Sequence, residues 1–274
     1  MRAAQYEENA KFLQRADAGI RALFEAAKTK DELNFAASLS PEFRPYKRNS
    51  AVDAQYAFAD YSLFLGRENE DDIRPRIALA FYSHLAEASG FWEVLKNLLE
   101  VARGQKFNVM PFAKFTARYG ASVGSTVPNA NRLMRRLVKS SSDAGFSDLQ
   151  ATFGDAFDSD LRNAYAHADY SLAKEGIFVL SRYNHERQVS WRDVNILLDH
   201  AIHLYLILND IRVEHCERYI EPKQVIGSLN ERDPAVPWLI EFKGSDRAMN
   251  IFNGHAMLQF ASYPNLPIFK PSEV

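Results

Sequence analysis

Arg162 and His167 are the two side chains whose types and spacing are best suited to chemistry, and Asn163 directly follows the arginine. A histidine imidazole titrates near neutral pH, so His167 can accept and donate a proton. An arginine guanidinium is planar and always charged, so Arg162 can stabilise negative charge on a crowded phosphate. Asn163 precedes His167 by four residues and could orient the imidazole or hold a phosphate oxygen. These residue types are together suited to acid–base chemistry beside a phosphate.

The segment that carries these residues, 148–169, is expected to be one helix with a continuous apolar face. That face consists of Leu149, Phe153, Phe157, Leu161 and Tyr165, flanked by Ala164 and Ala168. On a helix that advances about 100° per residue, four other side chains point away from it. They are Arg162, Asn163, His167 and Tyr170. We therefore expect these four side chains on the outer side of the helix, away from the core.

One helix alone does not bring Arg162 and His167 together, because they are about 140° apart around its axis. Small residues lie on the same outer face at Ser159 and Ala166, with Ala156 close by, and such residues let another backbone approach closely. Two copies that face each other would present both side chains to a shared groove. We therefore expect a homodimer that forms through this helix face.

A purely structural interpretation fits the same residues. Asp158 and Arg162 are spaced i, i+4 with the acid first, which is typical of a surface ion pair that contributes about 0.2–0.5 kcal/mol. His167 lies near the expected end of the helix, where a basic side chain interacts favourably with the helix dipole. The spacing alone leaves both interpretations open.

The stretch 162–170, RNAYAHADY, resembles the R-x(4 to 6)-H signature of the HEPN superfamily. Members of that superfamily often have Asn, Asp or His directly after the arginine, the position that Asn163 occupies here. The context is similar too, because the motif is expected late on a helix, before a short hairpin and a further long helix. The resemblance covers roughly residues 76–219 and implies an antiparallel helical bundle.

The resemblance also implies an activity. Many catalytic HEPN proteins are metal-independent endoribonucleases that work as dimers and leave a cyclic phosphate and a 5′-hydroxyl. The ribose 2′-hydroxyl would be the nucleophile, with His167 moving protons, Arg162 stabilising the phosphorane and Asn163 assisting. We therefore expect an RNA-cleaving enzyme in bacterial defence or in a toxin-like role, which is compatible with a neutralising protein partner. The alternative is a non-catalytic HEPN-like module that binds nucleotide or RNA, or that forms a dimeric scaffold.

RNA binding would need a local positive surface, because 33 Lys and Arg against 35 Asp and Glu give a formal charge of −2 and no attractive global field. Four basic residues share one face of the helix expected at 129–140. They are Arg132, Arg135, Arg136 and Lys139. We expect this face, together with Tyr170, to contact the substrate. The alternative is the solvated side of an amphipathic helix whose other side carries Leu133 and Leu137.

The candidates for metal ligation are weaker. His200 and His203 are spaced i, i+3 on a helix expected at 191–216, and His215 and Cys216 end that helix. Core packing and surface exposure explain these residues better than a metal site. The sequence has no P-loop, no Cys-x-x-Cys motif and no Ser-His-Asp order of catalytic residues. We expect neither a metal nor a cofactor.

The composition is that of a packed globular protein, with 274 residues of which 47% are hydrophobic and 25% are charged. The single Cys216 excludes an intramolecular disulfide, and the N-terminal residues are charged where a signal peptide would be apolar. The longest uncharged run, 248–269, contains Pro264 and Pro267 among several polar residues, which is not typical of a membrane helix. We expect a cytoplasmic protein that does not enter the membrane.

The elements expected to position the motif are mainly helices. Helices are expected at 3–28, 53–66, 77–102, 108–119, 129–140, 148–169 and 191–216. Residues 40–54 are expected to form a loop, residues 120–128 to interrupt the helices, and residues 176–191 to form a short hairpin. Ser147 and Gln150 predict a capping box, and Arg103 and Gly104 predict a helix end.

We expect three segments along the chain. Residues 1–75 form an N-terminal helical segment, 76–220 an HEPN-like helical bundle, and 221–274 a small β-containing appendage with Asn253 and Gly254 as a hairpin turn. The charged stretch 67–76 marks the first boundary. The predicted fold class is thus mainly α, with a short β-hairpin after the motif helix and a β-rich C-terminal end.

Overall fold

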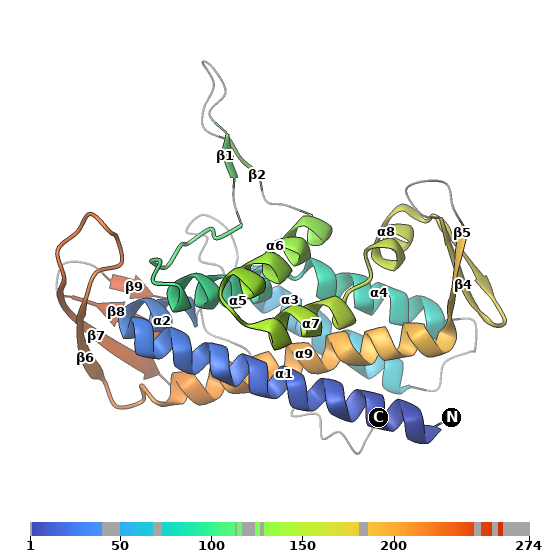
Figure 1. Ribbon diagram of the computed structural model, residues 1–274, viewed down its shortest axis with the longest axis horizontal. Coiled ribbons are helices and arrows are strands. Elements are labelled where there is room, and N and C mark those ends of the chain that lie inside the picture. The colour runs from blue at the N-terminus through green and yellow to red at the C-terminus, as the bar shows by residue number, and fades with distance from the viewer. Residues whose placement is uncertain are drawn as a thin grey trace.

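A computed structural model of the chain shows a mainly helical protein with three small antiparallel sheets (Figure 1). It describes residues 2–39, 50–67, 73–112, 114–116, 124–126, 129–180, 186–243, 248–253 and 257–259. The helices are α1 (Arg2–Lys30), α2 (Glu32–Ser38), α3 (Ser50–Gly66), α4 (Arg74–Glu87), α5 (Ser89–Ala102), α6 (Ala130–Asp143), α7 (Ser147–Ala156), α8 (Ser159–His167) and α9 (Trp191–Glu217). None of the described helices is long and apolar enough to cross a membrane.

The strands belong to three separate sheets. The first pairs β1 (Lys114–Thr116) with β2 (Gly124–Thr126). The second has the order β3-β4-β5 and consists of β3 (Tyr170–Ala173), β4 (Gly176–Leu180) and β5 (Glu186–Ser190). The third has the order β6-β7-β8-β9 and consists of β6 (Lys223–Gly227), β7 (Val236–Lys243), β8 (Ala248–Phe252) and β9 (Met257–Gln259).

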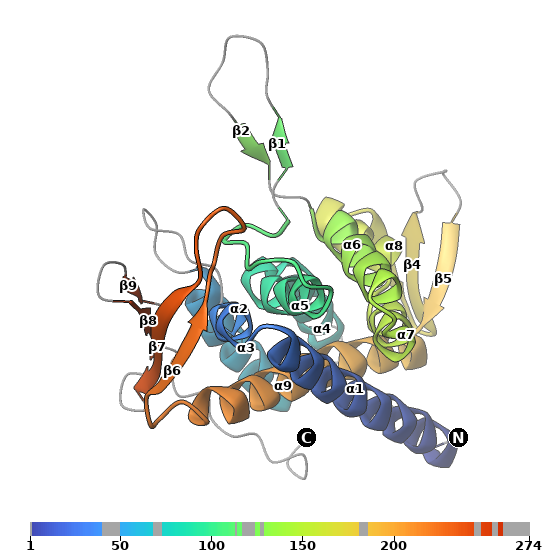
Figure 2. The same ribbon diagram turned by 60° about the vertical axis from the view of Figure 1, so that its left-hand side comes forward.

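The two longest helices, α1 and α9, pack along each other and form one side of the helical core (Figure 1). The apolar stripe that predicts the first helix is fully buried there, as at Ile20, Leu23 and Phe24, so that prediction is confirmed. Helices α5 and α7 also pack against α1 (Figure 2). The hydrophobic core is continuous from Phe12 in α1 to Ile251 in β8, and it therefore runs through all three expected segments.

The predicted helix at 77–102 is two helices, and this correction has a local cause. The backbone turns at Ala88 (φ −69°, ψ 67°) between α4 and α5. The indole N–H of Trp92 donates to the carbonyl of Leu85 at 3.0 Å, and that carbonyl would accept from Ser89 in a continuous helix. The predicted end is confirmed, because Gly104 has φ 85° and the Gly104 and Gln105 N–H groups donate back to Val101 and Glu100.

The predicted helix at 108–119 is wrong. The described residues after α5 form a loop, and Lys114–Thr116 form strand β1. Asn97 holds this loop with two hydrogen bonds of 3.0 Å, one from its amide to the Asn108 carbonyl and one to its oxygen from the Asn108 N–H. Side-chain bonding to the backbone thus replaces helical hydrogen bonds at this position. Of the predicted interruption at 120–128, the structure describes only residues 124–126, which form β2.

The predicted helix at 148–169 is also two helices, α7 and α8. Phe157 between them is extended (φ −136°, ψ 118°), and Asp158 caps α8 by accepting hydrogen bonds of 2.9 Å from the N–H groups of Asp160 and Leu161. The Asp158 N–H itself donates to the hydroxyl of Tyr82 in α4 at 2.6 Å. The predicted capping box at the start of α7 is wrong, because Phe146 is the N-cap and contributes no side-chain hydrogen bond.

The short sheet expected after the motif is confirmed and has one more strand than predicted. The motif helix ends at His167, and Ala168 adopts a left-handed conformation (φ 58°). Tyr170 therefore begins strand β3 and pairs with Val179, rather than lying on the helix as predicted. Gly176 starts β4 where a Cβ atom would come within 2.2 Å of the Val189 carbonyl, which explains glycine at that position. The turn at 181–185 lies outside the described residues.

The predicted C-terminal β-rich appendage is confirmed as the sheet β6-β7-β8-β9 (Figure 2). Strand β7 alternates in burial, and Trp238, Ile240 and Phe242 face the core. Strand β6 comes close to α2, because a Cβ atom on Gly227 would be 3.0 Å from Leu33. Phe252 pairs with Met257 across the predicted Asn253–Gly254 turn, of which Gly254 lies outside the described residues.

The remaining predicted helices are largely confirmed. The helices expected at 129–140 and 191–216 correspond to α6 and α9, whose N-caps Asn129 and Ser190 each accept a hydrogen bond from the backbone three residues later. Helix α3 covers the predicted helix at 53–66 and begins a few residues earlier, at Ser50. Of the loop predicted at 40–54, residues 50–54 belong to α3, and residues 40–49 lie outside the described residues. Helix α2 was not predicted.

Candidate functional site

Arg162 lies in the middle of α8, and its side chain is only 11% exposed. The guanidinium forms an ion pair with Glu87, the last residue of α4, and its Nη1 donates to Asn163 Oδ1 at 3.0 Å. Burial lowers the pKa of Arg162 below its ordinary value, although a guanidinium stays protonated in proteins. Its Nε is buried without a hydrogen-bond partner among the described residues.

These contacts correct two expectations about Arg162. The side chain lies between α8 and α4 rather than on a solvated outer face, because α4 packs directly against the short helix α8. The Asp158–Arg162 ion pair that the purely structural interpretation offered is also replaced. Asp158 caps α8 and pairs with Arg187 from β5, while Glu87 takes the place of Asp158 as the partner of Arg162.

Asn163 links the motif helix to the basic helix α6. Its Oδ1 accepts one hydrogen bond from Arg162 and another, of 2.8 Å, from the amide nitrogen of Asn131. Because a guanidinium can only donate, Asn163 must present its oxygen to Arg162, and this fixes the orientation of the Asn131 amide as well. Asn131 is 2% exposed. Its own Oδ1 is left buried without a partner among the described residues.

His167 is exposed at the end of α8, as expected. Within the part of the chain that the structure describes, its imidazole makes no hydrogen bond or ion pair. The following residue, Ala168, is the only described residue other than glycine with a positive φ. This left-handed backbone turns the chain out of the helix just after His167, at a cost of about 1–2 kcal/mol for an alanine. The imidazole is therefore free to contact a ligand or a second protein chain.

Tyr170 lies near the motif helix although it belongs to β3. Its ring is half-buried and stacks on Tyr165 of α8, with ring centroids 5.9 Å apart. Burial, followed by the influence of Tyr170, raises the pKa of Tyr165. The aromatic pair joins the sheet to the helix, which is a structural contribution in addition to the expected substrate contact.

The four basic residues of α6 differ in their surroundings. Arg132 and Arg135 are exposed, and neither side chain has a partner among the described residues. Arg136 donates to the carbonyl of Phe112 and so holds the loop after α5. Lys139 is 74% exposed and forms an i, i+4 ion pair with Asp143 at 2.7 Å. Arg132 and Arg135 are thus the members best placed to contact an anionic ligand.

A groove with a volume of 480 Å³ lies beside the motif helix. Its lining comes from α6, from α7 and from the start of α8, including Asn131, Arg135, Phe157 and Ser159. Asn131 therefore belongs both to the groove and to the hydrogen-bonded chain that reaches Arg162. Sequence reasoning missed Asn131 and Glu87, because each bonds to a residue far away along the chain.

The other histidines that the structure describes are taken up by packing. His200 stacks on Phe12 with ring centroids 3.8 Å apart, and burial lowers its pKa. His203 contacts the carbonyl of Asp199 at 2.7 Å. His215 is buried near Phe24, and burial lowers its pKa to about 4. Among the described residues, no three His, Cys, Asp or Glu side chains form a group that could hold a metal ion.

His84 is also engaged, since its Nε2 lies 3.1 Å from the Ala54 carbonyl between α4 and α3. His84 belongs to α4, the helix that also supplies Glu87 to Arg162. Its contact with Ala54 places the His84 ring against α3.

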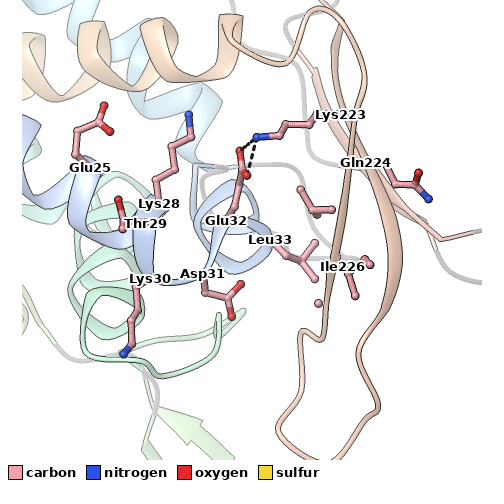
Figure 3. A pocket seen from close by; sticks show the side chains of 12 residues that line it. Glu25, Lys28, Thr29, Lys30, Asp31, Glu32, Leu33, Lys223, Gln224 and Ile226 are labelled. Atoms are coloured by element: carbon pink, nitrogen blue, oxygen red, sulfur yellow. Dashed lines mark hydrogen bonds and ion pairs between the residues drawn. The ribbon is translucent and has the colours of Figure 1, made fainter.

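A larger hollow of 790 Å³ lies between the α1–α2 junction and β6 (Figure 3). These elements lie at the end of the molecule away from α8 (Figure 1). Its lining mixes both signs of charge. Glu32 binds Lys223 through both carboxylate oxygens at 2.7 Å, and Asp31 pairs with Lys106 at 2.8 Å. Because these charges already neutralise each other, the hollow has less attraction for an anionic ligand than the α6 face.

Comparison with models of protein families, with curated proteins and with solved structures finds no match for this chain.

Proposed function

We propose that this protein is a metal-independent endoribonuclease of the HEPN type. The proposal is supported by the resemblance of residues 162–170 to the HEPN signature and by the surroundings of these residues. They lie on α8 in a mainly helical protein, and the small sheet β3-β4-β5 and the long helix α9 follow. The observation that carries the proposal is that His167, on the same short helix as Arg162, is exposed and has no partner among the described residues.

The proposed reaction needs no nucleophile from the protein. The ribose 2′-oxygen attacks the adjacent phosphorus and gives its proton to a base. The bond from phosphorus to the 5′-oxygen then breaks, and that oxygen takes up a proton, which leaves a cyclic phosphate and a 5′-hydroxyl. We assign His167 the role of base or acid, and Arg162 that of stabilising the phosphorane charge.

An RNA phosphate that binds Arg162 must compete with the carboxylate of Glu87. A phosphate has to displace or share the carboxylate, whose side chain is 42% exposed. Asn163 holds the guanidinium from the other side at 3.0 Å. The proposed role of Asn163 is thus to position Arg162, a role that the sequence did not indicate.

The proposal includes a homodimer that forms through the exposed end of α8. Ala166 and His167 are exposed and Ser159 is half-buried, so a second copy can approach this side of the helix. Each copy would then add its His167 to the other's Arg162, and one histidine could serve as base while the other serves as acid. A role in bacterial defence or as a toxin, with a neutralising protein partner, is proposed from the family resemblance alone.

The test is cleavage of mixed RNA in the presence of a chelator. His167→Ala should lower the cleavage rate about 10²- to 10⁴-fold, the usual contribution of a general acid or base. His203→Ala is the matched control, because His203 is a half-buried histidine on α9 outside the motif, and its rate should be unchanged. The 2′,3′-cyclic phosphate should be detectable on the product. Equal rates for His167→Ala and the wild-type protein would exclude the assignment.

The non-catalytic alternative is favoured by one observation, the burial of Arg162 against Glu87. In such a module the arginine would be a structural link between α8 and α4, and the protein would bind RNA or nucleotide without cutting it. A wild-type protein that binds RNA but cleaves none would support this alternative.

A further inference from the structure

The groove between α6 and α7 is an unassigned site beside the motif helix, with a volume of 480 Å³. Ligand pockets in proteins usually have volumes of about 300–1,000 Å³, so a single nucleotide unit fits its size. Ser159 lines the groove and lies one helical turn before Arg162 on α8. A strand of RNA whose phosphate reaches Arg162 would therefore have a neighbouring nucleotide close to this groove.

The wall of the groove holds a buried acceptor that has no partner among the described residues. Asn131 lines the groove, is 2% exposed, and has no hydrogen bond to its Oδ1 among the described residues. The amide nitrogen of Asn131 donates to Asn163 Oδ1 at 2.8 Å. Because Arg162 also donates to this oxygen, the Asn163 amide cannot flip, and Asn131 cannot turn its Oδ1 toward Asn163. A buried carbonyl without a partner is costly. An N–H group of a bound nucleobase can supply the missing hydrogen bond.

The other lining residues match the remaining parts of a nucleotide. Phe157 is half-buried and contributes an aromatic ring, on which a base can stack. Arg135 is exposed beside it and has no partner among the described residues, so it can bind a phosphate. Lys139 also lines the groove but is paired with Asp143.

We propose that this groove binds the nucleotide next to the cleaved phosphodiester, with the base between Phe157 and Asn131 and its phosphate on Arg135. This inference rests on the proposed function, because it takes RNA as the ligand. It assigns Asn131 two contacts, one to the base and one through Asn163 to Arg162. Occupation of the groove is thereby connected to the position of the guanidinium.

Gly154 provides a way to block the groove without disturbing the fold. It is an exposed residue of α7 that lines the groove, and a Cβ atom added there meets no atom within 4 Å outside its own helix. Gly154→Trp fills the groove with an indole ring. Gly154→Ala is the matched control, because it adds only the Cβ atom and leaves the groove open. Both changes replace a glycine inside a helix and should preserve α7.

The experiment measures RNA binding by the full chain carrying His167→Ala, so that the RNA stays intact. The probe is a short fluorescein-labelled single-stranded RNA of mixed sequence, and the Kd is obtained from fluorescence anisotropy. Gly154→Trp should raise the Kd about tenfold or more, the effect expected from the loss of one stacked base. Gly154→Ala should stay within about twofold of the His167→Ala parent. Thermal unfolding followed by circular dichroism checks that each variant is folded.

A second variant keeps the test decisive if the tryptophan variant does not fold. Phe157→Leu retains an apolar side chain at that position and removes the stacking surface, so it should also weaken binding several-fold. Equal affinity of the folded Gly154→Trp variant and its parent would overturn the subsite. The absence of measurable RNA binding by the parent would overturn it as well. Groove-dependent binding in a protein whose wild-type form cleaves no RNA would support the subsite and contradict the nuclease assignment.

Discussion

At the scale of single residues, the central feature is that Arg162 must be stabilised in a buried position and, in the proposed function, must also reach an RNA phosphate. The side chain is mostly buried, with Glu87 on one side and Asn163 on the other. A buried arginine needs such partners, because leaving a charge without them is strongly unfavourable. The same partners hold the guanidinium in one position, and Glu87 occupies one of the directions from which a phosphate could approach.

Replacing Glu87 by glutamine tests this competition directly. We expect Glu87→Gln to lower the KM for RNA, or the Kd in the His167→Ala background, by about two- to fivefold. The physical reason is that the amide has no negative charge to compete with the phosphate. Steady-state cleavage kinetics and fluorescence anisotropy measure the two constants.

The control for this substitution is Glu217→Gln, which makes the same change in net charge at the far end of α9 (Figure 1). It should leave both constants unchanged. Weaker RNA binding by Glu87→Gln would contradict the competition and would assign Glu87 the role of positioning Arg162.

At the scale of elements, α6 combines a basic face, which we propose to bind RNA, with an apolar face that packs in the core. Its apolar side chains, such as Leu133 and Leu137, are buried in the core. Of its basic side chains, Arg136 holds the Phe112 carbonyl, whereas Arg132 and Arg135 are exposed. Basic residues on one helix face thus differ in their contacts, because the loop after α5 offers a carbonyl to Arg136.

We expect the double variant Arg132→Gln and Arg135→Gln to flatten the dependence of RNA affinity on salt. The slope of log K against log salt should fall by about one to two, because about 0.7 counterions are released per phosphate contact with single-stranded nucleic acid. Anisotropy titrations at several salt concentrations measure this slope.

Arg136→Gln serves as the comparison within the same helix. It should leave the salt slope unchanged and reduce the free energy of unfolding by about 1–2 kcal/mol, through loss of a charge-assisted hydrogen bond. If the double variant had the wild-type slope, the α6 face would be solvated surface without a role in binding RNA.

At the scale of the whole molecule, α8 and the sheet β3-β4-β5 lie at one end, while the sheet β6-β7-β8-β9 lies at the other (Figure 1). Helices α1 and α9 connect these ends through one continuous core. The motif is therefore presented at an end of a packed helical body, with His167 exposed there. This placement allows two copies to meet through α8 without covering the opposite sheet.

Ala166→Trp tests the proposed homodimer. Ala166 is exposed on α8, so an indole ring should be tolerated in the monomer but should prevent close approach of a second helix. We expect a monomer in light scattering, a circular dichroism spectrum like that of the wild-type protein, and RNA cleavage reduced to the level of His167→Ala.

The control is Ala22→Trp, which places the same bulk on an exposed position of α1 and should keep the dimer and its activity. A wild-type protein that remains monomeric at high concentration while cleaving RNA would contradict the shared site.

The sequence by itself determined the long elements and the composition of the motif. Apolar periodicity over many residues identified α1, α6 and α9, because a helix with one buried face repeats its apolar residues every three to four positions. Alternation and turn residues identified the sheet after the motif and the β-rich C-terminal end. The exposure of His167 also followed from its position opposite the apolar stripe.

Only the tertiary structure decided where helices break and which groups the motif contacts. The turn at Ala88 is accompanied by a hydrogen bond from the Trp92 indole to the Leu85 carbonyl, and the turn at Phe157 by one from the Asp158 N–H to the Tyr82 hydroxyl. Glu87 and Asn131 come from distant parts of the chain to meet Arg162 and Asn163. Periodicity records which face of a helix is buried but not which polar partner lies opposite, so these long-range contacts become visible only when the chain is folded.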